Sequence, residues 1–136
     1  MDYVADLDPT HCVLRITVKT TVTDEVFSDL YWSIARLASE GGPYSAIVDF
    51  SHVDFPVSTE TLREFAAIRP AVPAGRRRVI VAPQPVVYGL SRMFELHRDS
   101  LGVEVQVVHS MEEAYELLNV SPEDFTQRLF PEDLAA

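Results

Sequence analysis

The chain has 136 residues, of which 47% are hydrophobic and 24% are charged, as expected for one globular domain over residues 1–136. Its 11 basic and 21 acidic residues give a net charge of −10, which argues against the basic faces that bind nucleic acids and membrane surfaces. Short apolar runs, an N-terminus without a basic start and a single cysteine exclude a membrane span, a signal peptide and an internal disulfide, so we expect a cytoplasmic protein.

The first third of the chain predicts two strands and a helix. Residues 4–7 and 12–18 are rich in apolar and β-branched side chains, and a turn at residues 8–11 separates them. Thr23 is a good helix cap, and Gly42 and Pro43 end the helix. At about 100° per residue, one face of this helix collects six apolar side chains. They are Val26, Phe27, Leu30, Tyr31, Ile34 and Leu37.

The middle of the chain alternates strands with helices. Residues 44–50 form an apolar strand without alternation, which is typical of a strand covered on both faces. A helix begins near Ser58 and ends about residue 69, with Leu62, Phe65 and Ala66 on its inner face. Residues 78–82 predict another buried strand, residues 85–99 a third helix and residues 103–109 a further strand.

The last part of the chain carries two helix starts. Ser110 and Glu113 have the spacing of a capping box, which opens a fourth helix. Ser121 and Pro122 open a short C-terminal helix over residues 122–130. The order of elements predicts an α/β fold with a mixed, mostly parallel sheet of about five strands and four to five helices. Seven side chains should be buried in that sheet. They are Ile47, Val48, Val79, Ile80, Val81, Val105 and Val107.

Motifs for catalysis, metals or cofactors are not evident in the sequence. The histidines at positions 11, 52, 97 and 109 lack the HxH or HExxH spacing of a metal site, and there is no glycine-rich phosphate loop. Cys12 reads as a buried inert thiol, His97 as a core histidine, and the basic run at residues 76–78 as the solvated start of a strand. We therefore expect no enzyme, no metal and no cofactor.

The segment from Asp49 to Thr59 resembles the signature of STAS domains, the fold of anti-sigma-factor antagonists. The pattern D-L-S-x-V-x-F-x-D-S-S-G is matched by seven residues in register, namely Asp49, Phe50, Ser51, Val53, Phe55, Ser58 and Thr59. Two positions depart from it, because Val57 replaces an aspartate and Glu60 replaces a glycine. The chain is thus similar to a divergent, SpoIIAA-like (STAS/SEC14-like) bacterial branch. The resemblance implies a STAS-like fold over most of the chain.

The leading functional hypothesis is a regulatory domain that docks a protein partner, with a homodimer as one option. In switching STAS proteins the position of Ser58 is phosphorylated, and a phosphate there would change the local charge. Serine is also among the best helix caps, so the hydroxyl has a purely structural alternative. The candidate site comprises Ser58, Thr59, Glu60 and Gln84, which meet at one sheet edge if the strands ending near residues 50 and 82 are neighbours.

The alternative hypothesis is a small-molecule or lipid-binding domain with an apolar pocket between sheet and helices. The aromatic residues Tyr31, Trp32, Phe65 and Phe94 are the candidates for its lining. Trp32 falls about 100° off the apolar face of its helix, so it either covers a neighbouring element or belongs to a partner surface.

Overall fold

Six strands form a single sheet in the computed structural model, which describes residues 3–40, 42–67, 75–85, 88–89, 92 and 105–129. The order across the sheet is β5-β4-β3-β2-β1-β6. Strands β2 to β5 run parallel to one another, and β1 pairs antiparallel with both β2 and β6. The strands are β1 (Tyr3–Asp8), β2 (Val13–Val18), β3 (Ser45–Asp49), β4 (Arg78–Val81), β5 (Val105–Val108) and β6 (Gln127–Leu129).

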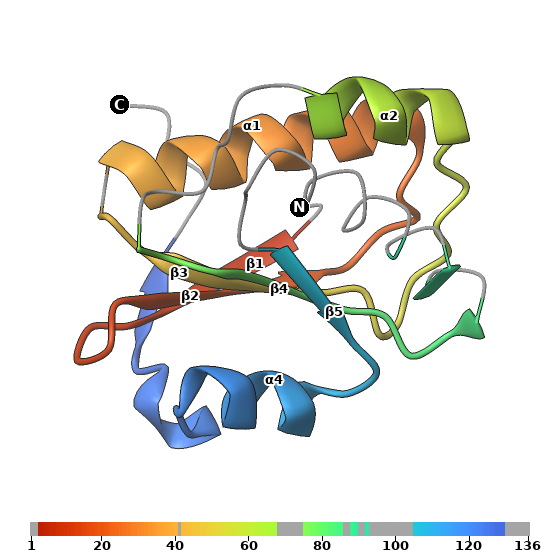
Figure 1. Cartoon of the computed structure of the whole chain (residues 1–136). Helices are drawn as coiled ribbons and strands as arrows, with labels where there is room; N and C mark the ends of the chain where they lie inside the picture. Colours follow the sequence, from red (N-terminus) through yellow and green to blue (C-terminus); the bar gives the residue numbers. More distant parts are fainter. Residues whose placement is uncertain are drawn as a thin grey trace.

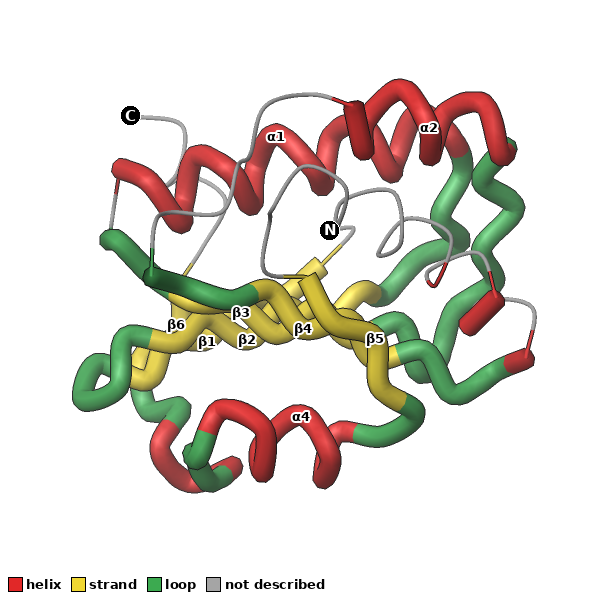
Figure 2. The backbone as a smooth tube through the Cα atoms, viewed as in Figure 1, coloured by secondary structure: helices red, strands yellow, loops and turns green. Residues whose placement is uncertain are grey.

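Helices lie on both faces of this sheet. Helices α1 (Asp24–Glu40) and α2 (Thr59–Ala67) cover one face, and α4 (Met111–Leu118) covers the other (Figure 1). The tube in Figure 2 shows the resulting three layers, with the sheet in the middle. The described helices include none that is long and apolar enough to cross a membrane.

Strand β3 is buried along its whole length, as its continuous apolar sequence predicts. Its neighbours β2 and β4 also contribute to both faces, so the sheet separates two hydrophobic clusters. The larger cluster lies under α1 and α2 and includes Leu30, Val48 and Ile80. The smaller cluster lies over α4 and includes Ile47 and Ala114. All seven side chains predicted to be buried in the sheet are at most 9% exposed.

The α/β class and the mixed, mostly parallel sheet are confirmed, but the counts differ from the prediction. The described part of the chain contains six strands, three α-helices and one short 3-10 helix, η1 (Pro122–Asp124). The first helix starts as predicted, because Thr23 Oγ1 accepts a hydrogen bond from the Val26 amide at 3.2 Å. The helix expected at residues 85–99 lies mostly outside the described residues, and His97 lies wholly outside them.

The prediction of a C-terminal helix over residues 122–130 is wrong. After η1 the chain extends and pairs with β1, where Asp6 lies opposite Arg128. Asp6 explains the strand, because its buried carboxylate accepts a hydrogen bond from Arg128 Nε at 2.6 Å and from Arg15 at 3.3 Å. Pairing β6 to the edge of β1 therefore brings the arginine to the aspartate and satisfies backbone groups of the edge strand.

The turn between β1 and β2 differs from the prediction at Cys12. The residue lies in the turn with a φ of 57°, one position before β2 begins, and it is half-buried rather than buried. Its carbonyl accepts a hydrogen bond from the Ser45 amide at 3.0 Å, which aligns the starts of β2 and β3.

Replacing Ser110 by alanine should lower the free energy of unfolding by about 0.5–2 kcal/mol. Ser110 Oγ accepts the Glu113 amide proton at 3.2 Å and caps α4, while the Glu113 carboxylate accepts the amide proton of His109. Urea denaturation followed by circular dichroism measures the change. Ser110→Asn keeps an accepting oxygen and is the matched control. An alanine variant as stable as the wild type would contradict the capping assignment.

Candidate functional site

A loop in which buried side chains alternate with more exposed ones follows β3 at the carboxyl edge of the parallel strands. Phe50, Val53, Phe55 and Val57 are buried, while the polar residues between them face outward or lie half-buried. The loop is fixed by its backbone, since the Phe50 amide donates to the Val81 carbonyl at 2.9 Å and the Val22 amide donates to the Asp54 carbonyl at 2.8 Å. The buried aromatic rings therefore have defined places beneath α1 and α2.

The two segments that the sequence places at this edge do meet. Strands β3 and β4 are parallel neighbours, and Gln84 Nε2 donates to the Ser51 carbonyl across the edge. Asp49 at the end of β3 orders the same turn, because its carboxylate accepts hydrogen bonds from the Ser51 amide at 2.8 Å and from the Ser51 hydroxyl. Gln84 thus has a bridging role at the edge, and its Oε1 atom is buried without a hydrogen-bond partner.

Ser58 links the starts of two helices. Its hydroxyl oxygen accepts the Thr61 amide proton at 3.1 Å, which caps α2. Its amide donates to Asp24 Oδ1 at 2.8 Å, and its hydroxyl lies 3.2 Å from Asp24 Oδ2. Asp24 is the first residue of α1, so this contact, the Asp24–Ser58 link, holds the two helix starts together.

The Asp24–Ser58 link has an electrostatic signature. The hydrogen bond from the Ser58 amide lowers the pKa of Asp24 below its ordinary value of 3.8, whereas desolvation acts in the opposite direction. The Ser58 and Thr61 hydroxyls lower the pKa further by smaller amounts. A carboxyl with a lowered folded-state pKa stabilises the fold above its ordinary pKa. That contribution is lost as the pH falls through the folded-state pKa.

The other candidate residues of α2 lie at its first turn. Thr59 is half-buried and Glu60 is exposed. A phosphate on Ser58 would place further negative charge against the Asp24 carboxylate and close to Glu60, and would break the link. The Ser58 hydroxyl therefore has a structural role as the helix cap that the sequence offered as an alternative, and it also contacts Asp24.

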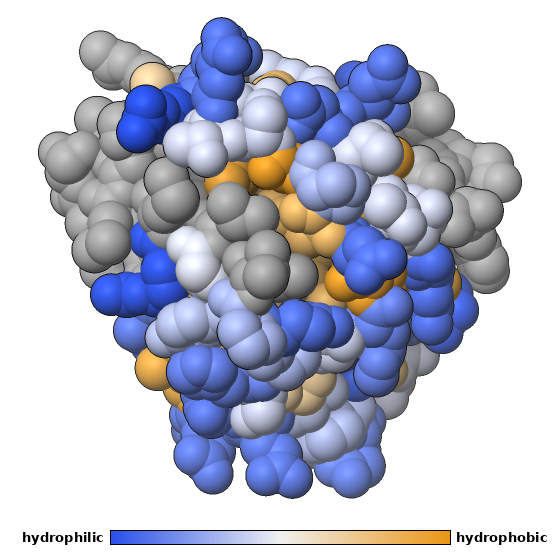
Figure 3. All heavy atoms as spheres, turned by 90° about the vertical axis from the view of Figure 1, so that its right-hand side faces the viewer, coloured by the Kyte–Doolittle hydropathy of each residue, from blue (hydrophilic) through white to orange (hydrophobic). Residues whose placement is uncertain are grey.

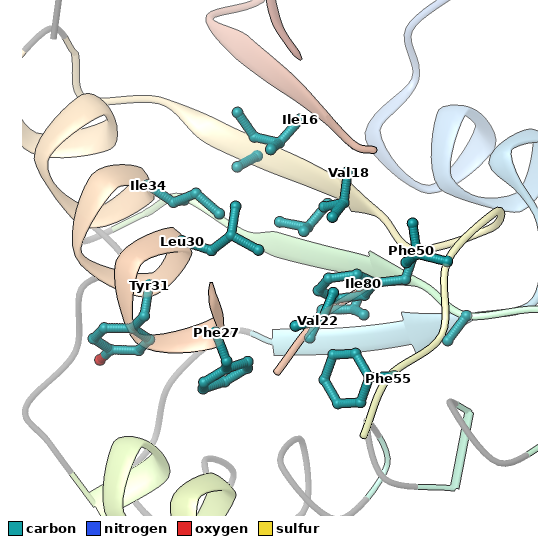
Figure 4. Packing of buried hydrophobic residues seen from close by; sticks show 14 of the residues in the cluster. Ile16, Val18, Val22, Phe27, Leu30, Tyr31, Ile34, Phe50, Phe55 and Ile80 are labelled. Carbon is teal, nitrogen blue, oxygen red and sulfur yellow. The ribbon is translucent and has the colours of Figure 1, made fainter. Parts of the chain in front are cut away.

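An apolar hollow lies between α1, α2 and the sheet. The cavity volume of this hollow is about 50 Å³, and the hollow opens to solvent. Figure 4 shows Leu30 and Ile34 projecting from α1 over the strands, and Phe27 near Phe55. The lining residues are Phe27, Leu30, Tyr31, Ile34, Val48, Phe50, Phe55, Leu62, Arg78 and Ile80.

The predicted pocket aromatics occupy different places. Tyr31 lines the hollow. Phe65 is half-buried on α2 and contacts Tyr31, with ring centroids 4.9 Å apart, and Phe27, with centroids 5.4 Å apart. Trp32 is 53% exposed and covers Phe65 from outside at 6.1 Å, as expected for a side chain that lies over a neighbouring element. Phe94 lies outside the described residues.

Arg78 is the charged residue of this lining, and the expectation of a solvated basic run is wrong for it. Arg78 is only 6% exposed, because the register of β4 places it on the same face as Ile80, under the helices. Its aliphatic stem can pack against apolar neighbours there. Arg76 and Arg77 are half-buried, and Arg77 donates to the Leu117 carbonyl near the end of α4.

The lining residues that sequence reasoning missed have an identifiable signal. Phe27, Leu30 and Ile34 belong to the apolar stripe of α1, which predicts burial but does not show where packing is incomplete. Figure 3 looks onto the carboxyl edge and shows apolar surface exposed between hydrophilic side chains.

Comparison with known proteins adds no family: no family model and no curated protein matches the chain.

The pKa of Asp24, measured by NMR titration of its carboxyl carbon, should lie below 3.8 in the wild type. In Ser58→Ala it should rise without reaching that value, because the amide of residue 58 still donates to the carboxylate. Ser33→Ala, in the middle of α1, is the control and should leave the Asp24 titration unchanged. A wild-type pKa at or above 3.8, or one that Ser58→Ala does not move, would remove the Asp24–Ser58 link.

Proposed function

We propose that the hollow under α1 and α2 binds a small apolar or amphiphilic molecule. The observation that carries the proposal is the lining, which is apolar or aromatic apart from Arg78. Small-molecule sites combine a few polar groups with mostly apolar ones, and this lining has that composition. The cavity of about 50 Å³ is smaller than the roughly 300–1,000 Å³ that drug-sized ligands occupy, so it suits a small ligand or part of one. Two of its lining residues, Phe50 and Phe55, lie at the carboxyl edge of the strands, where ligands bind in open α/β sheets.

The dimensions favour a ligand that lies partly in the mouth. The interior of about 50 Å³ holds only part of a molecule, so the remainder must occupy the open part of the hollow. Lipid-like carboxylates with a short chain match these requirements, because the chain fits among Val48, Ile34 and Ile80 while the polar end reaches solvent. The role is non-enzymatic, since an apolar lining favours capture by burial of apolar surface.

Decanoate should shift the methyl NMR signals of Val48 and Ile80, which line the hollow. The methyl groups of Val79 and Val81 are the internal control, because they lie in the same strand region but face the cluster over α4. Leu62→Trp puts a larger side chain into the lining and should weaken binding about tenfold or more. Arg63→Trp adds the same side chain at the exposed neighbouring position and should bind as the wild type does.

Two results would contradict pocket binding. One is an absence of decanoate-dependent shifts at Val48 and Ile80. The other is equal affinity in Leu62→Trp and the wild type. Because overpacking a buried position costs about 1–3 kcal/mol, circular dichroism must first show that Leu62→Trp is folded. Ile34→Ala, which enlarges the hollow, is the second variant and should strengthen the binding of longer chains.

We propose protein docking as a second candidate function, on the observation that Trp32 is the large hydrophobic side chain exposed in the described part of the chain. Tryptophan is enriched among residues that dominate binding energy at protein interfaces. Trp32 packs on Phe65 of α2, the helix that starts at Ser58, so both belong to one surface. Thr59 and Glu60 lie at the start of the same helix, α2.

Docking predicts that Ser58→Asp and Trp32→Ala each change the affinity for a partner isolated from the native host about tenfold or more. Ser58→Asp also places a carboxylate against Asp24, so it should destabilise the fold even though aspartate and serine cap helices comparably. Asp24→Asn in the same chain removes that repulsion and isolates the effect of charge at residue 58. Unchanged partner affinity in all three variants would exclude this surface.

We infer a STAS-like ancestry from the same segment. The order of a buried strand, a loop and a helix capped by Ser58 supports this inference. The apolar hollow supports the SEC14-like side of the resemblance, and the departures at Val57 and Glu60 fit a chain in which Ser58 serves as a structural link. Val57 is buried, so its place in the loop is one of packing.

A further inference from the structure

Three side chains with metal-binding atoms meet beside the β1–β2 turn, away from the hollow. Asp8 ends β1, His11 lies in the turn and Asp124 belongs to η1. One ligand atom of each residue lies within 4.8 Å of the others. Figure 1 shows the turn and the segment after α4 at the same end of the molecule. No sequence motif predicts the group, because Asp124 joins it only through the tertiary fold.

The backbone fixes the carboxylates of this group. Asp8 Oδ1 accepts the amide protons of Thr10 at 2.9 Å and of His11 at 3.1 Å, which leaves Oδ2 facing the His11 ring. Asp8 Oδ2 and His11 Nδ1 are joined by a hydrogen bond of 2.7 Å, which an ion bound to both atoms would replace, with release of the shared proton. Asp124 Oδ2 lies 3.9 Å from the same nitrogen and is held by the Ser121 amide at 2.9 Å. The three groups therefore converge without needing a rearranged backbone.

The charge of Asp8 is incompletely balanced. Its side chain is 0% exposed, and its contacts in the described structure are two amides and the imidazole of His11. The neighbouring buried carboxylate, Asp6, contacts two arginines instead. A buried carboxylate is costly without a counter-charge, and Asp8 has no arginine or lysine partner in the described structure. A cation shared by Asp8 and Asp124 would supply that charge.

We propose that Asp8, His11 and Asp124 bind a divalent transition-metal ion of the zinc class. Imidazole nitrogen and carboxylate oxygen are ligands that Zn²⁺ accepts, whereas Mg²⁺ and Ca²⁺ prefer oxygen alone. Zinc–ligand bonds of about 2.0–2.2 Å put tetrahedral ligand atoms about 3.3 Å apart, between the two separations from His11 Nδ1 observed here. His11 and Asp124 are 44% and 36% exposed, so solvent can reach the fourth position.

Such an ion would connect the β1–β2 turn to the segment that leads into β6. Because its ligands come together only in the folded chain, binding must stabilise the fold in proportion to the metal concentration. The net charge of −10 also favours the approach of cations.

Isothermal titration of the metal-free, untagged protein with Zn²⁺ tests the proposal. We expect one saturable site in the wild type, and binding about tenfold weaker or more in His11→Ala and in Asp124→Asn. His52→Ala removes an exposed loop histidine and Glu123→Gln neutralises an exposed acid in η1, so both controls should bind normally. Zn²⁺ should also raise the melting temperature of the wild type but not that of His11→Ala.

The test does not depend on Asp8, because Asp8→Asn would disturb a buried side chain that holds two turn amides. His11 and Asp124 are partly exposed and their variants should fold. A wild type without a saturable site overturns the proposal. So does undiminished affinity in His11→Ala or Asp124→Asn, or a loss of binding in His52→Ala; the group then serves only to order the turn.

Discussion

Burial of β3 on both faces is the constraint that organises this structure. A strand with every residue buried needs a layer of side chains above and below it, and a chain of 136 residues has few helices to supply them. On the side of α1 and α2, two helices share the larger cluster, and the Asp24–Ser58 link fixes how their starts approach each other. The hollow lies where these two helices and the strands fail to close completely.

On the face covered by α4, polar contacts of Arg15 hold the layer to the sheet. There Arg15 donates to the Tyr115 hydroxyl at 3.0 Å, contacts Asp6 and lies 4.6 Å from the centre of the Phe125 ring. Burial alone would lower the pKa of Arg15, but the contacts with Tyr115 and Asp6 raise it above its ordinary value. They connect β2 with α4 and with the segment after it, so polar contacts complete a layer that α4 is too short to cover alone. Asp6 and Asp8 lie two residues apart but have different partners. Asp6 contacts two arginines, and Asp8 contacts the imidazole of His11.

Much of the fold could be predicted from local patterns, because periodicity and helix caps act over a few residues. Thr23, Ser58 and Ser110 cap helices where expected, and the apolar stripe of α1 is buried except for Val26, which is partly buried. The features that could not be predicted depend on distant partners. Strand β6 has three residues and no periodicity, and its pairing follows from Asp6. Likewise, nothing near Arg78 in the sequence shows that the register of β4 turns it inward.

The same distinction applies to the candidate sites. The sequence identified Ser58 and Gln84 as residues of one edge, and the parallel pairing of β3 with β4 brings their segments together. It could not identify Asp24 as the partner of Ser58, since the two residues are joined only by the packing of α1 against α2. The group of Asp8, His11 and Asp124 was missed for the same reason, as its third member comes from the far end of the chain.

The side chains around the hollow explain why the fold leaves it unfilled. Phe55 packs perpendicular to Phe27 and against Phe50, with ring centroids 6.1 Å and 4.9 Å apart, so rigid rings separate α1 from the sheet at one end. Beyond them the branched side chains of Ile34, Val48 and Ile80 are too small to fill the space. A ligand seated there would bury apolar surface of its own and of the lining, so incomplete packing itself favours binding.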